Sequence, residues 1–187
     1  MTSDILHLLI NVVFSLFGIA LLIRAWMYTI RLHPFNPYSQ AVLRATDWLI
    51  QPIQKIVRPS NRIDWSSLLA CWVTAFLYLV LTWVVLTGQL PMPDTLLPAV
   101  LASFFTVLKW AFNLILWLTL IQAILSWVNP LAPIMPVLHT VTAPLLDPIR
   151  RIMPNLGGID FSPLVLLLLA QVAMMILQHL AFNLFGV

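Results

Sequence analysis

Apolar residues dominate four long stretches of the chain, which cover about residues 5–30, 66–88, 96–128 and 163–185. Arg24 interrupts the first stretch and Lys109 lies inside the third, whereas the second and fourth contain no charge. About 20 helical residues cross the roughly 30 Å of hydrocarbon in a bilayer, so each stretch predicts one transmembrane helix.

The long connection after the first stretch has a helical period. From Tyr38, apolar residues recur at positions 38, 41, 42, 45, 48, 49, 52, 53 and 56, which is the spacing of one helical face. The opposite face carries Arg44, Asp47, Gln51, Gln54, Lys55 and Arg58. Asn36 and Pro37 suit an N-cap and a first-turn proline, and Pro52 is expected to kink the helix near its end. We expect this amphipathic helix to lie in the lipid headgroup layer.

The connection between the third and fourth apolar stretches has a similar amphipathic helical pattern, but a less regular one. One helical face is shared by Leu138, Val141, Leu145, Ile149 and Ile152. Pro144 and Pro148 interrupt it, so the segment is expected to be either a broken helix or a shallow re-entrant loop pressed against the spans.

Composition supports a membrane protein, with 61% hydrophobic residues, 8% charged residues and a mean hydropathy of +1.00. Soluble domains carry about a quarter charged residues. The single cysteine, Cys71, rules out an intramolecular disulfide, and a scattered net charge of +3 gives no reason to expect a nucleic-acid partner. The N-terminal segment lacks the basic region of a signal peptide, so we expect it to remain as a span.

Basic residues gather in the two long connections. The first contains or adjoins Arg31, Arg44, Lys55, Arg58 and Arg62, and the third contains Arg150 and Arg151. Because Lys and Arg are biased toward cytoplasmic loops, both long loops are expected in the cytoplasm and both termini outside.

The chain repeats itself along its length. Asp64 and Asp160 are 96 positions apart, as are Pro52 and Pro148, and the sequence IDWS at 63–66 recurs as IDFS at 159–162. We expect two copies, residues 1–92 and 93–187, each with two spans and an amphipathic loop. Such copies have the same orientation and are related by an axis along the membrane normal.

The repeated pattern resembles the YggT family, also called YlmG, of small bacterial and chloroplast membrane proteins. Residues 46–55 and 142–151 carry the middle of the pattern, and the two IDWS and IDFS segments carry its end. The signature positions are Asn36, Pro37, Thr46, Pro52, Asp64 and Ser66 in the first copy, and Thr142, Pro148, Asp160 and Ser162 in the second. The resemblance covers essentially the whole chain and implies a multi-pass protein of the bacterial inner membrane.

The resemblance also suggests what the protein does. The family is associated with osmotic stress and potassium homeostasis, with membrane and division-site organisation, and with cytochrome haem attachment. We expect a role in osmotic-stress or cation homeostasis, and an assembly or organising factor for membrane complexes is the alternative. A direct pore or carrier is less favoured, because few polar residues lie on the spans. The expected partners are anionic lipid headgroups, and a membrane protein or a second copy of the chain.

Five basic residues are candidates for binding lipid headgroups or an acidic partner segment: Arg44, Lys55, Arg58, Arg150 and Arg151. The alternative is that they only set topology. Asp147 precedes Arg150 by three residues and Arg151 by four, so it can pair with either on a helical turn. When the two copies are aligned, Gln122 stands at the position of Arg24, and Arg150-Arg151 stands at the position of Gln54-Lys55. We therefore do not expect the two copies to have identical functions.

Four further charged residues have two interpretations each. Asp64 and Asp160 precede spans, and helix capping is favoured over ion binding. Arg24 either extends to the headgroups or pairs with the loop inside the membrane. Lys109 with Trp110 forms either an interfacial anchor, which is favoured, or a charge within the bilayer.

The remaining chemistry excludes most enzyme classes. The histidines, His7, His33, His139 and His179, lack metal-ligand spacing, and the chain has no glutamate, phosphate-binding loop or nucleophile–base pattern. We therefore expect no catalytic, cofactor or metal site.

Overall fold

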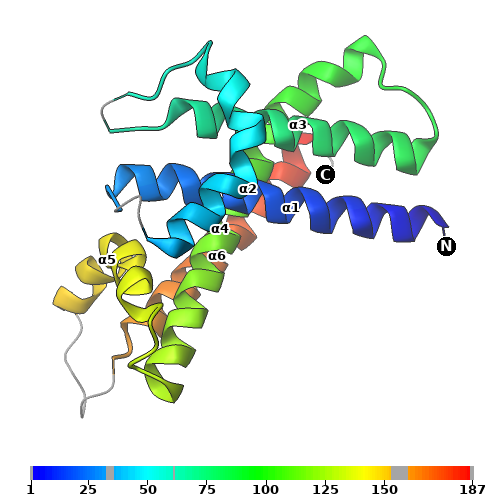
Figure 1. The fold of residues 1–187 in the computed structure, drawn as a ribbon. Coiled ribbons are helices and arrows are strands. Elements are labelled where there is room, and N and C mark those ends of the chain that lie inside the picture. Colours follow the sequence, from blue (N-terminus) through cyan, green and yellow to red (C-terminus); the bar gives the residue numbers. More distant parts are fainter. Residues whose placement is uncertain (1, 33–35, 61, 153–159, 186–187) are drawn as a thin grey trace.

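The computed structural model describes residues 2–32, 36–60, 62–152 and 160–185, and the regular structure in these ranges is entirely helical. The helices are α1 (Thr2–Thr29), α2 (Pro37–Gln54), α3 (Trp65–Thr87), α4 (Pro93–Val128), α5 (Met135–Ile152) and α6 (Ser162–Phe185) (Figure 1). Four of them, α1, α3, α4 and α6, are long and apolar enough to cross a membrane. The prediction of an all-α membrane protein with four spans and helices in the long loops is confirmed.

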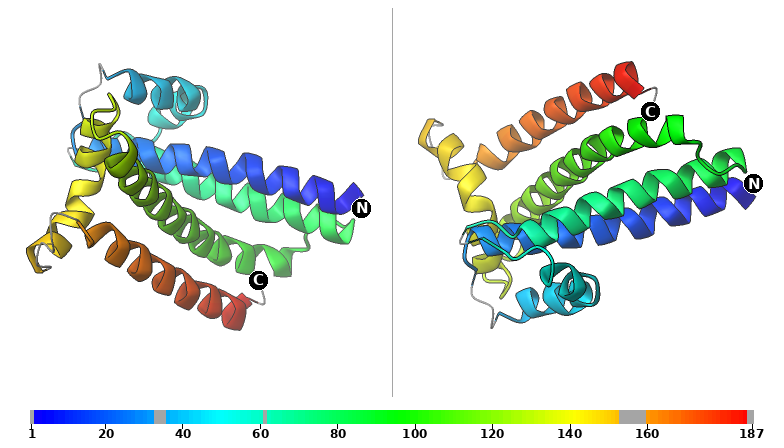
Figure 2. Two further views of the ribbon diagram at one scale, coloured as in Figure 1. Left: turned by 90° about the horizontal axis from the view of Figure 1, so that it is seen from below. Right: turned by 90° about the horizontal axis from the view of Figure 1, so that it is seen from above.

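Each half of the chain forms a pair of spans with one loop helix. α1 packs along α3 with α2 against both, and α4 packs along α6 with α5 against both. α4 also contacts α1 and α3, which joins the halves. Figure 2 shows the two chain ends at one end of the bundle and the loop helices α2 and α5 toward the other. The halves therefore have the same orientation, as a parallel duplication requires.

Local signals in the sequence fix the helix ends. The side chain of Asn36 accepts a hydrogen bond from the amide of Tyr38 over 3.0 Å, and Pro37 occupies the first turn of α2. That helix ends at Gln54, two residues after Pro52. Gly88 ends α3 in the left-handed conformation, with φ of 68°, which a glycine adopts without steric cost.

The loop helices differ in detail from the sequence expectations. α5 is one helix that contains both Pro144 and Pro148, rather than a re-entrant loop. α2 packs on the spans through Ser39, Thr46 and Ile50, with Leu49 and Ile53 partly buried against the core, and the rest of its predicted apolar face is largely exposed, with Trp48 68% accessible. The exposed apolar residues suit the lipid headgroup layer, whereas Ser39, Thr46 and Ile50 fix the helix to the protein.

The core joins α1 to α4 at the middle of the bundle. Trp110 is 4% exposed and lies against Gly18, where a Cβ atom would come within 2.2 Å of the indole atom Cε3. Gly18 is near the midpoint of α1, so Trp110 lies beside the middle of that helix. Trp110 therefore packs inside the bundle, and the position of Lys109 relative to the membrane interface stays a prediction. α4 is continuous from Pro93, so it is longer than the roughly 20 residues that cross a bilayer.

Candidate functional site: equivalent cavities beside the two loop helices

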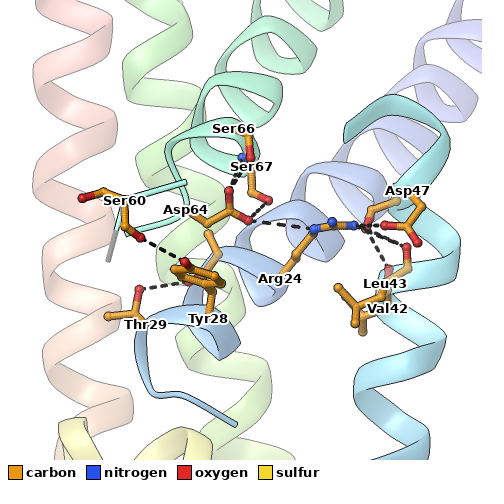
Figure 3. A network of polar contacts seen from close by, with 12 residues as sticks. Arg24, Tyr28, Thr29, Val42, Leu43, Asp47, Ser60, Asp64, Ser66 and Ser67 are labelled. Atoms are coloured by element: carbon orange, nitrogen blue, oxygen red, sulfur yellow. Dashed lines mark hydrogen bonds and ion pairs between the residues drawn. The ribbon is translucent and has the colours of Figure 1, made fainter. Parts of the chain in front are cut away.

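Arg24 links the first span to the first loop helix. Its Nη1 atom donates hydrogen bonds to Oδ1 of Asp47 over 2.6 Å and to Oγ1 of Thr46 over 2.9 Å (Figure 3). Its Nε atom lies 3.9 Å from Oδ2 of Asp64 at the start of α3. The Arg24 side chain is 9% exposed. Of the two interpretations of Arg24, the structure therefore supports a buried cation paired with the loop.

Asp64 has two roles in this network. It is the N-cap of α3, and its carboxylate accepts hydrogen bonds from the amide of Ser67 over 3.2 Å and from the hydroxyls of Ser66 and Ser67 (Figure 3). The predicted cap is thus confirmed. The same carboxylate is also a counterion of Arg24, which the sequence did not reveal because the two residues are 40 positions apart.

The second half of the chain attaches its loop helix without a buried charge. Gln122 takes the place of Arg24 on α4, and its Oε1 atom accepts a hydrogen bond from the hydroxyl of Thr142. Its Nε2 atom lies 3.0 Å from Nδ1 of His139. Thr46 and Thr142 are equivalent signature residues, and both are buried. Each threonine therefore joins its loop helix to the preceding span by a hydrogen bond with the side chain at the same repeated position, Arg24 or Gln122.

Asp160 forms an ion pair with Arg150, which is not the equivalent of the arginine that pairs with its counterpart Asp64. The Nη2 atom of Arg150 on α5 lies 2.8 Å from Oδ2 of Asp160, and the amide of Ser162 donates to Oδ1 over 2.9 Å. Arg150 also reaches Asp147, over 3.4 Å, as the helical spacing predicted. The second loop helix is thus tied to the start of α6 by an ion pair.

The repeated positions line one cavity in each half of the chain. The first cavity, of about 580 Å³, is lined in part by Arg24, Leu43, Gln54 and Asp64. The second, of about 400 Å³, is lined in part by the equivalent residues Gln122, His139, Arg150 and Asp160. The arginine and the glutamine have exchanged places between the span and the loop helix. At these repeated positions each cavity therefore keeps one arginine, one glutamine and one aspartate, and Arg31 also lines the first cavity.

Burial makes the two ion pairs electrostatically different. The side chains of Arg24 and Asp64 are 9% and 4% exposed, whereas those of Arg150 and Asp160 are 34% and 42% exposed. Burial raises the pKa of Asp160, but hydrogen bonds from Ser162 and Arg150 and the arginine's positive charge outweigh it, so the pKa lies below the ordinary 3.8. In both halves one arginine lies between two carboxylates, an arrangement that holds a loop helix in place.

The candidate basic residues fall into two groups. Arg150 is engaged by Asp147 and Asp160. The other four are exposed and form no ion pair within the described residues: Arg44, Lys55, Arg58 and Arg151. Those four are available to a ligand outside the protein, whereas Arg150 is a structural residue.

The remaining residues predicted from the sequence lie at helix starts, inside a helix or outside the described residues. Ser66 and Ser162 are buried at the starts of α3 and α6, and Pro148 lies inside α5. His33 and position 159 of the second signature lie outside the described residues. Within the described ranges, no three His, Cys, Asp or Glu side chains are grouped as a metal site would require.

Comparison with known proteins supports the duplication. The family model described as CCB3/YggT matches residues 3–85 and 101–181. "Uncharacterized protein YggT" of Escherichia coli (strain K12) is 37% identical over 169 residues, or 89% of this chain and 86% of that protein. "Uncharacterized protein in proC 3'region" of Vibrio alginolyticus is 35% identical over 167 residues, or 88% and 89%. "Uncharacterized protein PA0392" of Pseudomonas aeruginosa is 29% identical over 187 residues, or 89% and 85%. No solved structure matches.

Proposed function

Because the chain belongs to the CCB3/YggT family, we propose that it is a non-enzymatic protein of the bacterial inner membrane that supports osmotic-stress and potassium homeostasis. Its working surface is the pair of loop helices, α2 and α5. One observation carries this proposal: each loop helix is attached through a buried threonine, Thr46 or Thr142, to a polar side chain of the preceding span. Two helices held at the same end of the bundle form a paired platform.

The exposed basic residues give this platform its chemistry. Arg44, Lys55 and Arg58 belong to α2 and the segment after it, and Arg151 belongs to α5. With the long loops in the cytoplasm, these side chains face the negatively charged inner leaflet. Each basic residue near that surface contributes on the order of 1 kcal/mol of attraction. The platform therefore binds anionic lipid headgroups, or the acidic cytoplasmic segment of a partner that regulates cation content.

Charge reversal on the loop helices tests the proposal. A deletion strain carrying Arg44→Glu with Arg151→Glu should fail to grow in high-osmolarity, low-potassium medium, at a membrane abundance equal to that of the wild type. Arg150 is left intact because it holds α6 through Asp160. The matched control is Arg62→Glu, which changes an exposed arginine outside the helices. Full rescue by the first variant, or equal failure of both, would show that the helices carry no specific function.

An assembly role for membrane complexes remains the alternative, and the exposed apolar stripe of α2 is the feature that favours it. Trp48 on α2 is 68% exposed, and Ile56 in the segment after α2 is 85% exposed, which suits a protein partner as well as lipid. Purification in mild detergent separates the two roles. A stoichiometric partner protein that is lost on Trp48→Ala would support assembly, and a homo-oligomer with no partner would support direct action in homeostasis.

A further inference from the structure

An open polar cavity lies between the membrane-spanning helices, away from both loop helices, and its residues Asn11, Lys109 and Gln178 are exposed. It has a volume of about 390 Å³, and its polar lining comes from four spans: Asn11, Ser15, Tyr78, Lys109, Asn113 and Gln178. Asn11 and Ser15 are four residues apart on α1, and so are Lys109 and Asn113 on α4, so each pair presents one helical face. This volume falls within the range of about 300–1,000 Å³ for ligand pockets.

The cavity lies beside the middle of α1, which is a candidate membrane span. Trp110, which follows Lys109, packs on Gly18, and that glycine is 16 residues from Thr2 and 11 from Thr29. At 1.5 Å per residue, these separations are about 24 and 17 Å along the helix. Lys109 therefore lies near the middle of the bundle, where a charged side chain is costly unless it has a partner.

The chain itself supplies no partner for this charge. No carboxylate within the described ranges lies within 4.0 Å of the Lys109 ammonium group, and this group makes no hydrogen bond there. The amide of Gln178 is likewise without a hydrogen-bond partner among those residues. By contrast, Tyr78 donates to Oδ1 of Asn11 over 3.4 Å, which leaves the amide donor of Asn11 available.

We propose that this cavity binds an oxyanion, a carboxylate or phosphate group, that pairs with Lys109 among the spans. The ammonium supplies the charge, and the amides of Asn11 and Gln178 donate hydrogen bonds to the remaining oxygen atoms. The same chemistry accepts a small water-soluble anion or the anionic group of a lipid, because apolar side chains such as Leu16, Leu79 and Leu177 also line the cavity.

The two lysines of the chain, Lys55 and Lys109, make a direct test possible. The full chain is purified with isotope-labelled lysine, and the two side-chain NMR signals are assigned from Lys55→Gln and Lys109→Gln. One arm adds sodium phosphate or sodium acetate in a neutral detergent at constant ionic strength. The other compares nanodiscs of phosphatidylcholine with nanodiscs that contain phosphatidylglycerol.

The expected result is a saturable shift of the Lys109 signal in at least one arm, with the Lys55 signal unchanged or shifting linearly. A shift with soluble anions identifies a free anion as the ligand, and a shift only with phosphatidylglycerol identifies a lipid. Gln178→Leu should weaken binding about tenfold, which corresponds to about 1.4 kcal/mol. No saturable shift in either arm, or equal behaviour of Lys55 and Lys109, would overturn the proposal.

Discussion

The indole nitrogen of Trp26 donates a hydrogen bond to the carbonyl oxygen of Val141 over 2.9 Å. Trp26 is on α1 and Val141 is on α5, so this bond joins a span of the first repeat to the loop helix of the second. Position 124, which aligns with Trp26, is an isoleucine and has no side-chain donor. The contact is therefore asymmetric, and it fixes α5 relative to the first half of the chain.

Removing this donor should loosen the contact between the repeats. Trp26→Phe keeps an aromatic ring but leaves the Val141 carbonyl without its donor, which should lower the free energy of unfolding by about 0.5–1.5 kcal/mol. Hydrogen exchange measured by mass spectrometry should show faster exchange in α5, with α2 unchanged. Equal acceleration in both loop helices would indicate general destabilisation instead. Trp127→Phe is the matched control, because Trp127 is 74% exposed.

Arg24 and Asp47 should show strong energetic coupling. In the second repeat, glutamine replaces Arg24 and Ala143 replaces Asp47, so both charges are absent together. Arg24→Gln alone should cost about 1–3 kcal/mol, because it leaves carboxylates without their charged donor. Adding Asp47→Ala should recover part of that loss, with a coupling energy of about 0.5–3 kcal/mol. A double-mutant cycle of unfolding measured in detergent gives the value, and simple additivity would contradict the pairing.

Asp160 should contribute stability that depends on pH. Its carboxylate accepts from Ser162 and pairs with Arg150, and its pKa is lowered in the folded protein. A lowered pKa gives stability that is fully present above the ordinary value of 3.8 and is lost as the pH falls through the folded-state pKa. Asp160→Asn should therefore be less stable than the wild type at pH 7, and the difference should shrink at acid pH.

The capping role of Asp160 is separable from its charge. Asn retains an oxygen that accepts from Ser162, whereas Asp160→Ala removes it and should cost about 0.5–2 kcal/mol. Thermal unfolding in detergent should rank the wild type above Asn and Asn above Ala. If Asn and Ala are equally damaging, the ion pair with Arg150 dominates and the cap contributes little. Asp94→Asn is a control for loss of one carboxylate in a different turn.

Most of the fold was predictable because its signals are local. Apolar stretches of span length, the Asn36-Pro37 start of α2 and the cap at Asp64 each depend on neighbouring residues. The Arg24 network was harder to predict, since it brings together three helices. One usable signal was present: aligning the repeats puts Arg24 against Gln122 and Gln54 against Arg150, which is the exchange seen in the cavities.

The position of Lys109 along the bundle could not be obtained from the sequence. It follows from the packing of Trp110 on Gly18, and the relative axial position of two packed helices is a tertiary property. A glycine inside an apolar helix is only a weak hint of close approach. The polar lining of the intramembrane cavity was visible as separate residues, but the four helices that bring those residues together were not.

Gly18 should be sensitive to the addition of one methyl group. The Cβ atom of an alanine would come within 2.2 Å of Cε3 of the buried Trp110 indole. Such overpacking typically costs about 1–3 kcal/mol, because the indole or the helices must shift. Gly18→Ala should therefore lower the unfolding temperature in detergent, and Trp110→Leu in the same chain should restore part of it. A stable single variant, or a double variant no better than Gly18→Ala, would show that the contact is not tight.

The orientation in the membrane can be tested with cysteines at exposed positions. The loop helices and the chain ends lie toward opposite ends of the bundle, and basic residues gather on the loop side (Figure 2). Because that side is expected in the cytoplasm, Ser60→Cys and Thr140→Cys should be shielded from an impermeant thiol reagent in intact cells. Gln89→Cys, in the turn between α3 and α4, should react.

The native Cys71 is buried and should contribute little, and Cys71→Ala provides the background chain. All three positions should react after the cells are permeabilised, which controls for local accessibility. Reaction at Ser60→Cys and Thr140→Cys in intact cells, with Gln89→Cys shielded, would reverse the orientation and place the basic platform outside the cell.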